Sequence, residues 1–302
     1  MEDFYLVLIK NNGDIIHNIF ATSHRDLINK YLRPEDIQDR TCFRATYSPK
    51  CGHRLDDVEN YQLIINETYV PDWFNGELAE EIMDKLKSII KSMIVRRRKQ
   101  ILLHEGAILC GNAVIDEIKH SIIFGMYDNS KIKLLDKNSE VNIMTDNSII
   151  SEMYDSTKVI EMSGFAVVEK MWNYSKILNM REYASIGVMN DNSHVVVLKG
   201  DANVIEMKDD AQANKLKHMS RISEMYGHSV VEEMWDWTVV GKMFDQSRIN
   251  HMNHDSKVME MFGDSMVEYM CDNSVIGRLC ENSLVRKLDA AAKILRNELN
   301  RK

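Results

Sequence analysis

The amino-acid sequence predicts a mainly β protein whose largest part is a β-solenoid, and three observations support this. From residue 121 to residue 288 the chain repeats every nine residues without an insertion. Position 1 of each repeat is Ser, Thr or Ala, position 3 is Ile or Val except at Ala213, and position 6 is Met or Leu. Positions 7 to 9 are rich in Asp, Asn and Gly, which form turns. A fixed short period means that every repeat meets the same environment, so the repeats stack.

Each repeat is long enough for one short strand and one turn. Residues two apart in a strand face the same way, so positions 1 and 3 point inward together. The step of three residues to position 6 breaks this alternation and indicates a bend. Three inward rows result, with Met as an adaptable core residue. Burial of one Ile or Val and one Met contributes roughly 3–5 kcal/mol per repeat before chain entropy is subtracted. Two or three repeats per coil are both possible. We favour two, because Met can then reach its counterpart across a thin core.

Residues 1–93 predict a small α+β head domain. Ser23 is a candidate cap for a short helix that Pro34 ends. Asn75 precedes the clearest helix, residues 77 to about 94, which has an apolar stripe along one side. Four strands are expected, at residues 4–9, 15–20, 41–47 and 61–65.

The solenoid is expected over residues 100–288. Ala113, Ile115 and Ile118 match the repeat one residue out of register, which indicates an imperfect first repeat. Because stacked strands invite growth from uncovered ends, we expect the head and its long helix to cover the N-terminal end. Residues 289–302 predict a C-terminal capping helix, with an apolar side formed by Ala291, Ala292, Ile294, Leu295 and Leu299.

The composition limits the classes of partner. The chain has 302 residues and a net charge of −8, which disfavours nucleic acid and leaves protein partners open. Its five cysteines have no disulfide-framework spacing, which is typical of a reducing compartment, so we expect a cytoplasmic protein. The acidic start Met1–Asp3 does not resemble a signal peptide, and no apolar run is long enough to cross a membrane.

The sequence contains no established catalytic motif, so we expect neither an enzyme nor a bound cofactor or metal. Cys42, Cys51 and His53 are the one candidate metal cluster. Their spacing matches no paired-Cys zinc site, and a fourth ligand is not evident.

Two turn positions are candidate binding surfaces. Position 8 carries many acidic residues, and Asp ordinarily forms the turn there. Stacking would nevertheless arrange carboxylates in a ladder that could meet a basic partner or imitate a phosphate backbone. Position 7 carries aromatic residues, which form a contact surface if they face solvent and corner packing if they do not. The candidate binding residues are Asp236, Asp245 and Asp272, with Tyr226, Trp235, Phe244 and Phe262.

A candidate oligomer face lies near the middle of the repeat array. Apolar residues replace the Glu and Lys found elsewhere at outward positions, which suggests that a second subunit or the head covers them. The residues are Val188, Val196 and Val197, together with Ile186, which itself continues the β-branched row of position 3.

Two stretches carry a resemblance to other proteins: DNSVIGRLCENSLVRKL, which begins at Asp272, and GHSVVEEMWDWTVVGKM, which begins at Gly227. They resemble the tandem S-x-V/I-x-x-M units of uncharacterised bacterial and phage proteins. In those proteins the array also follows a leader with a P-x-W-F-like segment, here Pro71–Phe74. The resemblance implies a solenoid encoded by bacteria, their phages or mobile elements, and it carries over no catalytic residue. The architecture is also similar in kind to pentapeptide-repeat proteins, some of which mimic DNA, although their period is five.

These observations favour a non-enzymatic, cytoplasmic solenoid that binds another macromolecule, such as a phage-encoded modulator of a host protein. The alternative is a structural or assembly protein that forms homo-oligomers. An enzyme or metal-dependent domain in the head, around Cys51 and His53, is the third hypothesis.

Overall fold

The computed structural model describes residues 4–38 and 41–299. The chain forms two compact units. The head runs to Val95 and includes Glu105–Ile108, and the solenoid comprises Arg96–His104 and continues from Leu109. Two short strands, β5 (Ile94–Val95) and β7 (Gly106–Leu109), fall at the sequence boundaries between these units.

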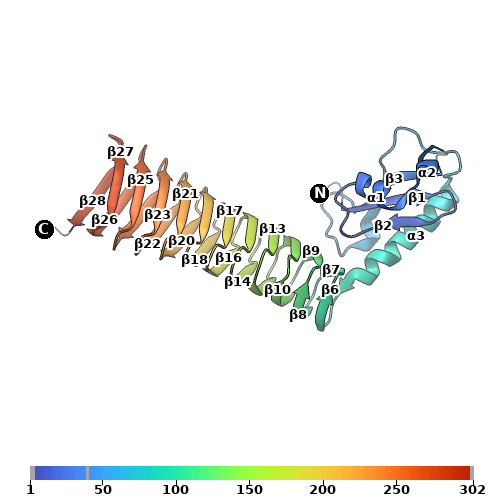
Figure 1. Cartoon of the computed structure of the whole chain (residues 1–302), viewed down its shortest axis with the longest axis horizontal. Coiled ribbons are helices and arrows are strands. Elements are labelled where there is room, and N and C mark those ends of the chain that lie inside the picture. The colour runs from blue at the N-terminus through green and yellow to red at the C-terminus, as the bar shows by residue number, and fades with distance from the viewer. Residues whose placement is uncertain (1–3, 39–40, 300–302) are drawn as a thin grey trace. The chain divides into compact units, whose positions relative to one another are not determined.

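The head is built on an antiparallel sheet with the strand order β2-β1-β3-β4. Its four strands and the helices α1 and α3 match the predicted α+β head in kind and order, whereas α2 was not expected (Figure 1). The strands are β1 (Tyr5–Lys10), β2 (Ile15–His17), β3 (Cys42–Pro49) and β4 (Tyr61–Ile65); the helices are α1 (His24–Tyr31), α2 (Pro34–Gln38) and α3 (Gly76–Met93), with a 3-10 turn at Val58–Asn60.

Local side-chain chemistry explains where the head helices begin. The Ser23 side chain accepts a hydrogen bond from the Asp26 amide at the start of α1, and Asn75 accepts one from the Leu78 amide at the start of α3. Pro34 begins α2 rather than simply ending α1, because proline is well suited to the first turn of a helix. No helix among the described residues is long and apolar enough to span a bilayer.

The second unit is a β-solenoid of about 11 turns. The even-numbered strands from β6 to β28 form one parallel sheet of 12 strands among the described residues, here called the even sheet. They are β6 (Lys99–Leu103), β8 (Val114–Lys119), β10 (Lys131–Asp136), β12 (Ile149–Met153), β14 (Val167–Met171), β16 (Ser185–Met189), β18 (Asn203–Met207), β20 (Arg221–Met225), β22 (Val239–Met243), β24 (Lys257–Met261), β26 (Val275–Glu281) and β28 (Lys293–Leu299).

The odd-numbered strands from β9 to β27 lie in the second parallel sheet, here called the odd sheet. They are β9 (Ile122–Met126), β11 (Glu140–Met144), β13 (Lys158–Met162), β15 (Lys176–Met180), β17 (His194–Leu198), β19 (Gln212–Leu216), β21 (Val230–Met234), β23 (Arg248–Met252), β25 (Met266–Met270) and β27 (Leu284–Leu288).

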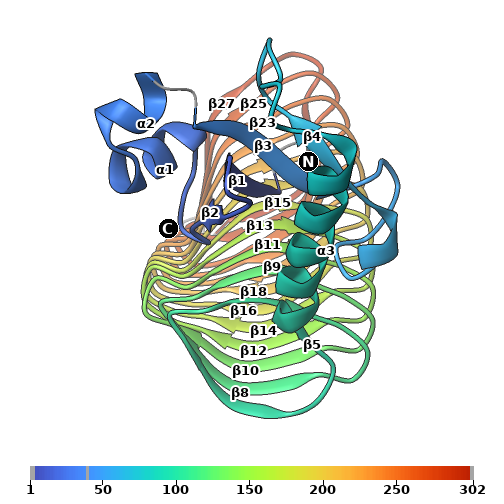
Figure 2. The same cartoon turned by 90° about the vertical axis from the view of Figure 1, so that its right-hand side faces the viewer.

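Each coil contains two repeats, one per sheet, as favoured from the sequence. In the even sheet Ile132 pairs with Ile150, and Leu135 pairs with Met153, which is a step of 18 residues. Viewed along the stack, each coil is a flattened loop with a corner on either side (Figure 2).

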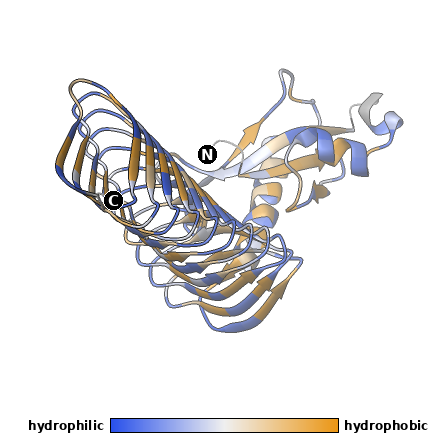
Figure 3. Ribbon diagram, turned by 60° about the vertical axis from the view of Figure 1, so that its left-hand side comes forward, coloured by the Kyte–Doolittle hydropathy of each residue, from blue (hydrophilic) through white to orange (hydrophobic). Residues whose placement is uncertain are grey.

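Positions 1, 3 and 6 face inward, so the core consists of the three predicted rows. Val204 and Met207, for example, are fully buried in β18, while Ile205 between them points to solvent. The same alternation of apolar and polar segments runs along the coils in Figure 3. Methionine at position 6 is therefore a core residue, and its flexible side chain fills the space between the two sheets.

The first regular coil explains the register shift seen in the sequence. Ile115 pairs with Ile132 and Ile118 pairs with Leu135, so β8 is a normal member of the even sheet. The corner at His120, a residue with positive φ, is one residue shorter than the later corners and absorbs the shift.

The C-terminal capping helix predicted for residues 289–302 is wrong. Residues 293–299 form β28, which pairs in parallel with β26, and residues 300–302 lie outside the described part of the chain. The repeat continues for one more unit: Ala292 takes the buried small position, and Ile294 pairs with Ile276 of the position-3 row. This last repeat was not recognised in the sequence for two reasons. Asn297 stands where earlier repeats have Met or Leu, and the alanine-rich turn before it has a composition typical of a helix. That the head covers the other end stays a prediction.

Candidate interaction surfaces

The solenoid has two rows of corners, and each candidate residue must be assigned to one of them. Corners that follow odd-numbered strands are here called odd corners, and those that follow even-numbered strands are called even corners. Corners of the same kind stack from coil to coil: the Asn147 amide, for example, donates to the Asp128 carbonyl at 2.9 Å. A surface along one row therefore consists of residues 18 apart in the sequence.

Position 8 has a left-handed backbone conformation at nearly every corner, with φ between 52° and 62° at the non-glycine residues of the regular repeats. Asn, Asp and Gly tolerate this conformation better than other residues. The requirement explains why Asp recurs at position 8, with Gly164, Gly200, Gly227 and Gly263 in the same place.

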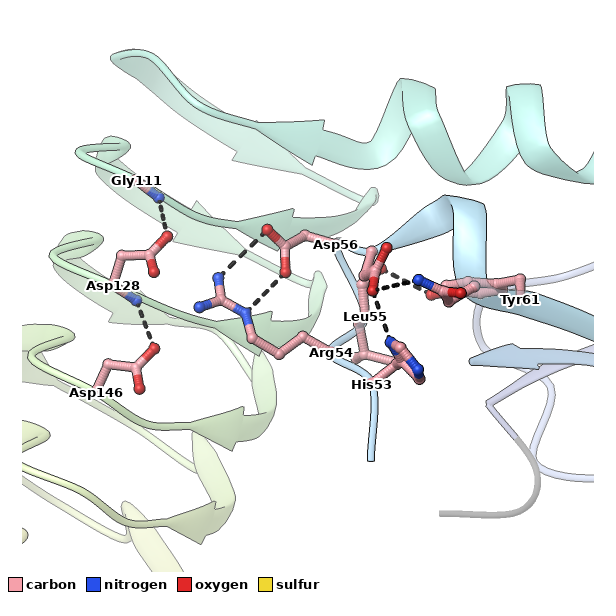
Figure 4. A network of polar contacts seen from close by, with 10 residues as sticks. His53, Arg54, Leu55, Asp56, Tyr61, Gly111, Asp128 and Asp146 are labelled. Atoms are coloured by element: carbon pink, nitrogen blue, oxygen red, sulfur yellow. Dashed lines mark hydrogen bonds and ion pairs between the residues drawn. The ribbon is translucent and has the colours of Figure 1, made fainter. Parts of the chain in front are cut away.

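The position-8 carboxylates also bind the backbone of the preceding coil. Figure 4 shows two steps of this ladder: the Gly111 amide donates to Asp128 Oδ2 at 2.7 Å, and the Asp128 amide donates to Asp146 Oδ2 at 3.0 Å. Parallel coils leave this corner amide without another backbone acceptor, and the carboxylate satisfies it. The acidic ladder therefore has a structural role within the solenoid.

The three acidic candidates make this same contact, but they do not form one row. Asp236 and Asp272 lie in odd corners, where they accept from the amides of His218 (3.1 Å) and His254 (3.0 Å). Asp245 lies in an even corner and accepts from the Gly227 amide at 3.0 Å. The single ladder expected from the nine-residue step is wrong, because successive repeats alternate between the two sides of the coil.

Asp236 has an additional side-chain contact. The His218 amide and the His254 ring, which lies 3.2 Å from Asp236 Oδ1, hold the pKa of this carboxyl below its ordinary range. Trp235 packs edge-on against the same His254 ring, with the ring centroids 5.3 Å apart. This part of the odd corners is therefore a packed polar cluster.

The aromatic candidates also divide between the two corner rows. Tyr226, Phe244 and Phe262 stack on one another in successive even corners, with centroid distances of 4.9 Å and 5.3 Å. All three are half-buried. A hydrogen bond to Glu224, together with burial, raises the pKa of Tyr226 to about 12. Trp235 lies apart from them in an odd corner and donates from Nε1 to Glu233 at 2.9 Å. The even-corner rings therefore pack mainly against each other.

The predicted oligomer face does not exist as one surface. Ile186 is fully buried in the core row. Val188 lies on the even sheet, whereas Val196 and Val197 lie on the odd sheet, so they face opposite sides of the solenoid. The error has the same cause as that of the acidic ladder, because neighbouring repeats belong to different sheets.

A row of exposed apolar residues, interrupted in one coil, lies instead at position 9 of the odd corners. Its members are 53–65% exposed, and Phe165 and Tyr183 stack at 5.2 Å between centroids. Asp201 occupies the same position in the coil between Tyr183 and Met219. A search of the sequence at intervals of 18 residues would have found this row. It consists of Phe165, Tyr183, Met219 and Trp237.

A row of cations lies beside it at position 7 of the same corners: Arg181, Lys199 and Lys217. Within the described residues none of the three makes an ion pair. Some lysines on the sheets do pair: Lys158, for example, pairs with Glu140 of the preceding coil at 2.8 Å. We call the two rows together the odd-corner surface, defined by Phe165, Tyr183, Met219, Trp237, Arg181, Lys199 and Lys217.

Of the candidate metal residues in the head, His53 has another partner. His53 Nδ1 lies 2.7 Å from Asp57, and hydrogen bonds from Asn60 and His53 lower the pKa of Asp57. Next to His53, Arg54 pairs with Asp56 at 2.9 Å (Figure 4). No group of three or more His, Cys, Asp or Glu side chains in the described part of the chain could hold a metal ion. Cys42 and Cys51 are free thiols.

Comparisons with known proteins give no relative to set beside this geometry. A scan of family models and searches of curated proteins and of solved structures each returned no match.

Proposed function

We propose that this protein is a non-enzymatic solenoid that binds a protein partner along the odd-corner surface. The observation that carries the proposal is the coincidence, on one side of the stack, of an exposed apolar row and a row of cations without ion pairs. The regular coils hold both rows at the strand spacing of about 4.8 Å.

The apolar row is larger than the scattered exposed residues of an ordinary surface. Phe165 and Tyr183 are neighbours, and Met219 and Trp237 follow in adjacent coils further along. Contiguous exposed apolar groups with a polar rim typically mark contacts with other proteins. The row has aromatic residues at both ends, Phe165 and Tyr183 at one and Trp237 at the other, and aromatic residues are the kind that dominates binding energy.

The cations indicate the charge of the partner. Arg181, Lys199 and Lys217 are stacked in register, and like charges that directly face each other repel. Carboxylates of a partner would remove this repulsion. The surface therefore fits a protein segment that carries acidic side chains next to apolar ones.

One feature favours protein over nucleic acid as this partner. The rings of Phe165 and Tyr183 are parallel within 9°, so they cover the faces on which bases would stack. The acidic ladders are a weaker basis for a nucleic-acid mimic, because each carboxylate that accepts a corner amide has one oxygen engaged.

The resemblance of the repeats to bacterial and phage sequences supports a finer proposal: a modulator of a host protein in the bacterial cytoplasm. The alternative is an assembly role, which requires contacts between copies.

A direct test is affinity capture from bacterial extract, with three purified proteins compared in parallel. They are the intact chain, a variant with Phe165→Ser, Tyr183→Ser and Trp237→Ser, and a control with Tyr174→Ser. Tyr174 is a matched control because it is equally exposed at position 9, but in an even corner. A protein that is retained by the intact chain and the control, and lost by the triple variant, supports the proposal. Equal retention by all three contradicts it.

A further inference from the structure

The outward face of the even sheet carries a row of six charges at position 5 of its last six strands. They lie side by side in register from β18 to β28. In order they are Glu206, Glu224, Lys242, Glu260, Arg278 and Arg296.

The signs of these charges are antisymmetric about the midpoint between β22 and β24. Lys242 and Glu260 flank this midpoint with opposite charges. One strand further out the pair is Glu224 and Arg278, and two strands further out it is Glu206 and Arg296. A row with this property attracts a copy of itself that runs in the reverse order.

The neighbouring position-4 row has exposed apolar side chains separated by small residues. Ile205, Met259 and Leu295 are 49–66% exposed. Between them, Ser223, Gly241 and Gly277 line a shallow groove of about 780 Å³. A Cβ added at Gly241 would lie 2.5 Å from the Ser223 carbonyl oxygen, so the backbone of the adjacent coil keeps this part of the groove open.

The same two-fold operation matches this second row. An axis parallel to the strands, between β22 and β24, reverses the strand order and leaves each position opposite the same position. Met259 of one copy then faces the hollow at Gly241 of the other, and Leu295 faces Ile205. Two such sheets pack about 10 Å apart, which is the reach of these side chains.

We propose that this even-sheet face binds the same face of a second copy, in an antiparallel two-fold dimer. An unrelated partner would require complementary charge, but it would not require the row to be antisymmetric. Only a contact between identical surfaces makes that demand. The odd-corner surface and its partner are not involved, so this inference is independent of the proposed function.

The size of the face predicts weak association. Six strands at about 4.8 Å and five residues at about 3.3 Å give roughly 500 Å² per copy, or about 1,000 Å² in total. This is near the lower limit for a specific interface. Within one chain, Arg278 pairs with Glu260 at 2.7 Å and Lys242 lies 4.0 Å from Glu224. These pairs are partly exposed to solvent and contribute little alone, so they can be shared across the dimer.

The test is sedimentation velocity on the full chain and on two charge variants. An all-acidic row carries Lys242→Glu, Arg278→Glu and Arg296→Glu. An all-basic row carries Glu206→Lys, Glu224→Lys and Glu260→Lys. We expect the intact chain to dimerise at about 100 μM and each variant alone to associate at least about tenfold more weakly. An equimolar mixture of the two variants should recover the dimer.

Two further proteins complete the design. The double variant Ile205→Ser and Leu295→Ser leaves every charge in place and should also weaken the dimer, which covers the case that a charge variant fails to fold. A control with Lys158→Glu, Lys176→Glu and Lys215→Glu changes three outward charges of the odd sheet and should dimerise like the intact chain. A monomeric intact chain, a dimer that persists in all variants, or a mixture that stays monomeric would each overturn the proposal.

Discussion

Asp245 offers a direct test of the structural role assigned to the position-8 carboxylates. Its φ is 57°, and its Oδ2 accepts the Gly227 amide of the preceding coil at 3.0 Å. Three substitutions separate these two contributions. Asparagine keeps both the tolerance for positive φ and an acceptor oxygen, glycine keeps only the tolerance, and alanine keeps neither.

The magnitudes follow from these two contributions. A left-handed conformation costs about 1–2 kcal/mol at an ordinary L-residue. The hydrogen bond contributes about 0.5 kcal/mol, at the lower end of the usual range because Asp245 is exposed. We therefore expect Asp245→Asn to change the free energy of unfolding by less than about 0.5 kcal/mol. Asp245→Gly should cost about 0.5–1.5 kcal/mol, which includes the greater freedom of glycine in the unfolded chain, and Asp245→Ala about 1.5–2.5 kcal/mol.

Urea denaturation measures the order of stability, and hydrogen exchange at the Gly227 amide measures the local contact. Exchange at Gly227 should accelerate in the glycine and alanine variants and stay slow in the asparagine variant. If Asp245→Ala were as stable as the intact chain, or if asparagine were as damaging as alanine, the account of the corner would be refuted.

Three further predictions concern the core and the odd corners. Met207→Ala should cost about 2–5 kcal/mol, because the side chain is fully buried, whereas Ile205→Ala in the same strand should change stability by less than about 0.5 kcal/mol; thermal denaturation compares the two. Ser256→Ala should be neutral or stabilising, since the buried Ser256 hydroxyl has no hydrogen-bond partner. Ser148→Ala should cost about 1 kcal/mol, because the Ser148 hydroxyl donates to a carbonyl at 2.6 Å. If urea denaturation showed the reverse order of stability for the two variants, this reasoning would be contradicted. The folded-state pKa of Asp236 is lowered, so its contribution to stability is present above its unfolded pKa of about 3.9 and is lost as the pH falls through the folded pKa. The variant Asp236→Asn should therefore reduce the loss of stability at acid pH in a plot of unfolding free energy against pH. An unchanged plot would show that the contact contributes nothing.

The fold could be predicted from the sequence because its determinants are local and periodic. Val204 and Met207 occupy inward positions that recur in every repeat of the sequence. Ser23 and Asn75 are recognisable from the sequence as residues that cap the start of a helix. The last coil was not predicted, because Asn297 replaces the Met or Leu that marks position 6 of the other repeats. There the alternation of Ala292 and Ile294 was too short to be distinguished from an amphipathic helix.

The surfaces could not be predicted from a nine-residue step, because they depend on which repeats lie above one another. Asp236 and Asp245 are neighbours in the repeat but lie on opposite sides of the coil. Phe165 and Tyr183 lie 18 residues apart in the sequence and stack in space. Which residues share a surface depends on the number of repeats in each coil, and the pairing of strands in the structure gives that number.

Site-specific photo-crosslinking tests the central claim, that the odd corners bind a protein partner, most directly. A photoreactive residue replaces Tyr183 of the odd corners in one protein and the equally exposed Tyr174 of the even corners in another. Both proteins are irradiated in bacterial cells that produce them. We predict that one protein partner is cross-linked from position 183 and not from position 174. The same partner cross-linked from position 174 alone, or no cross-link from position 183, would contradict the account.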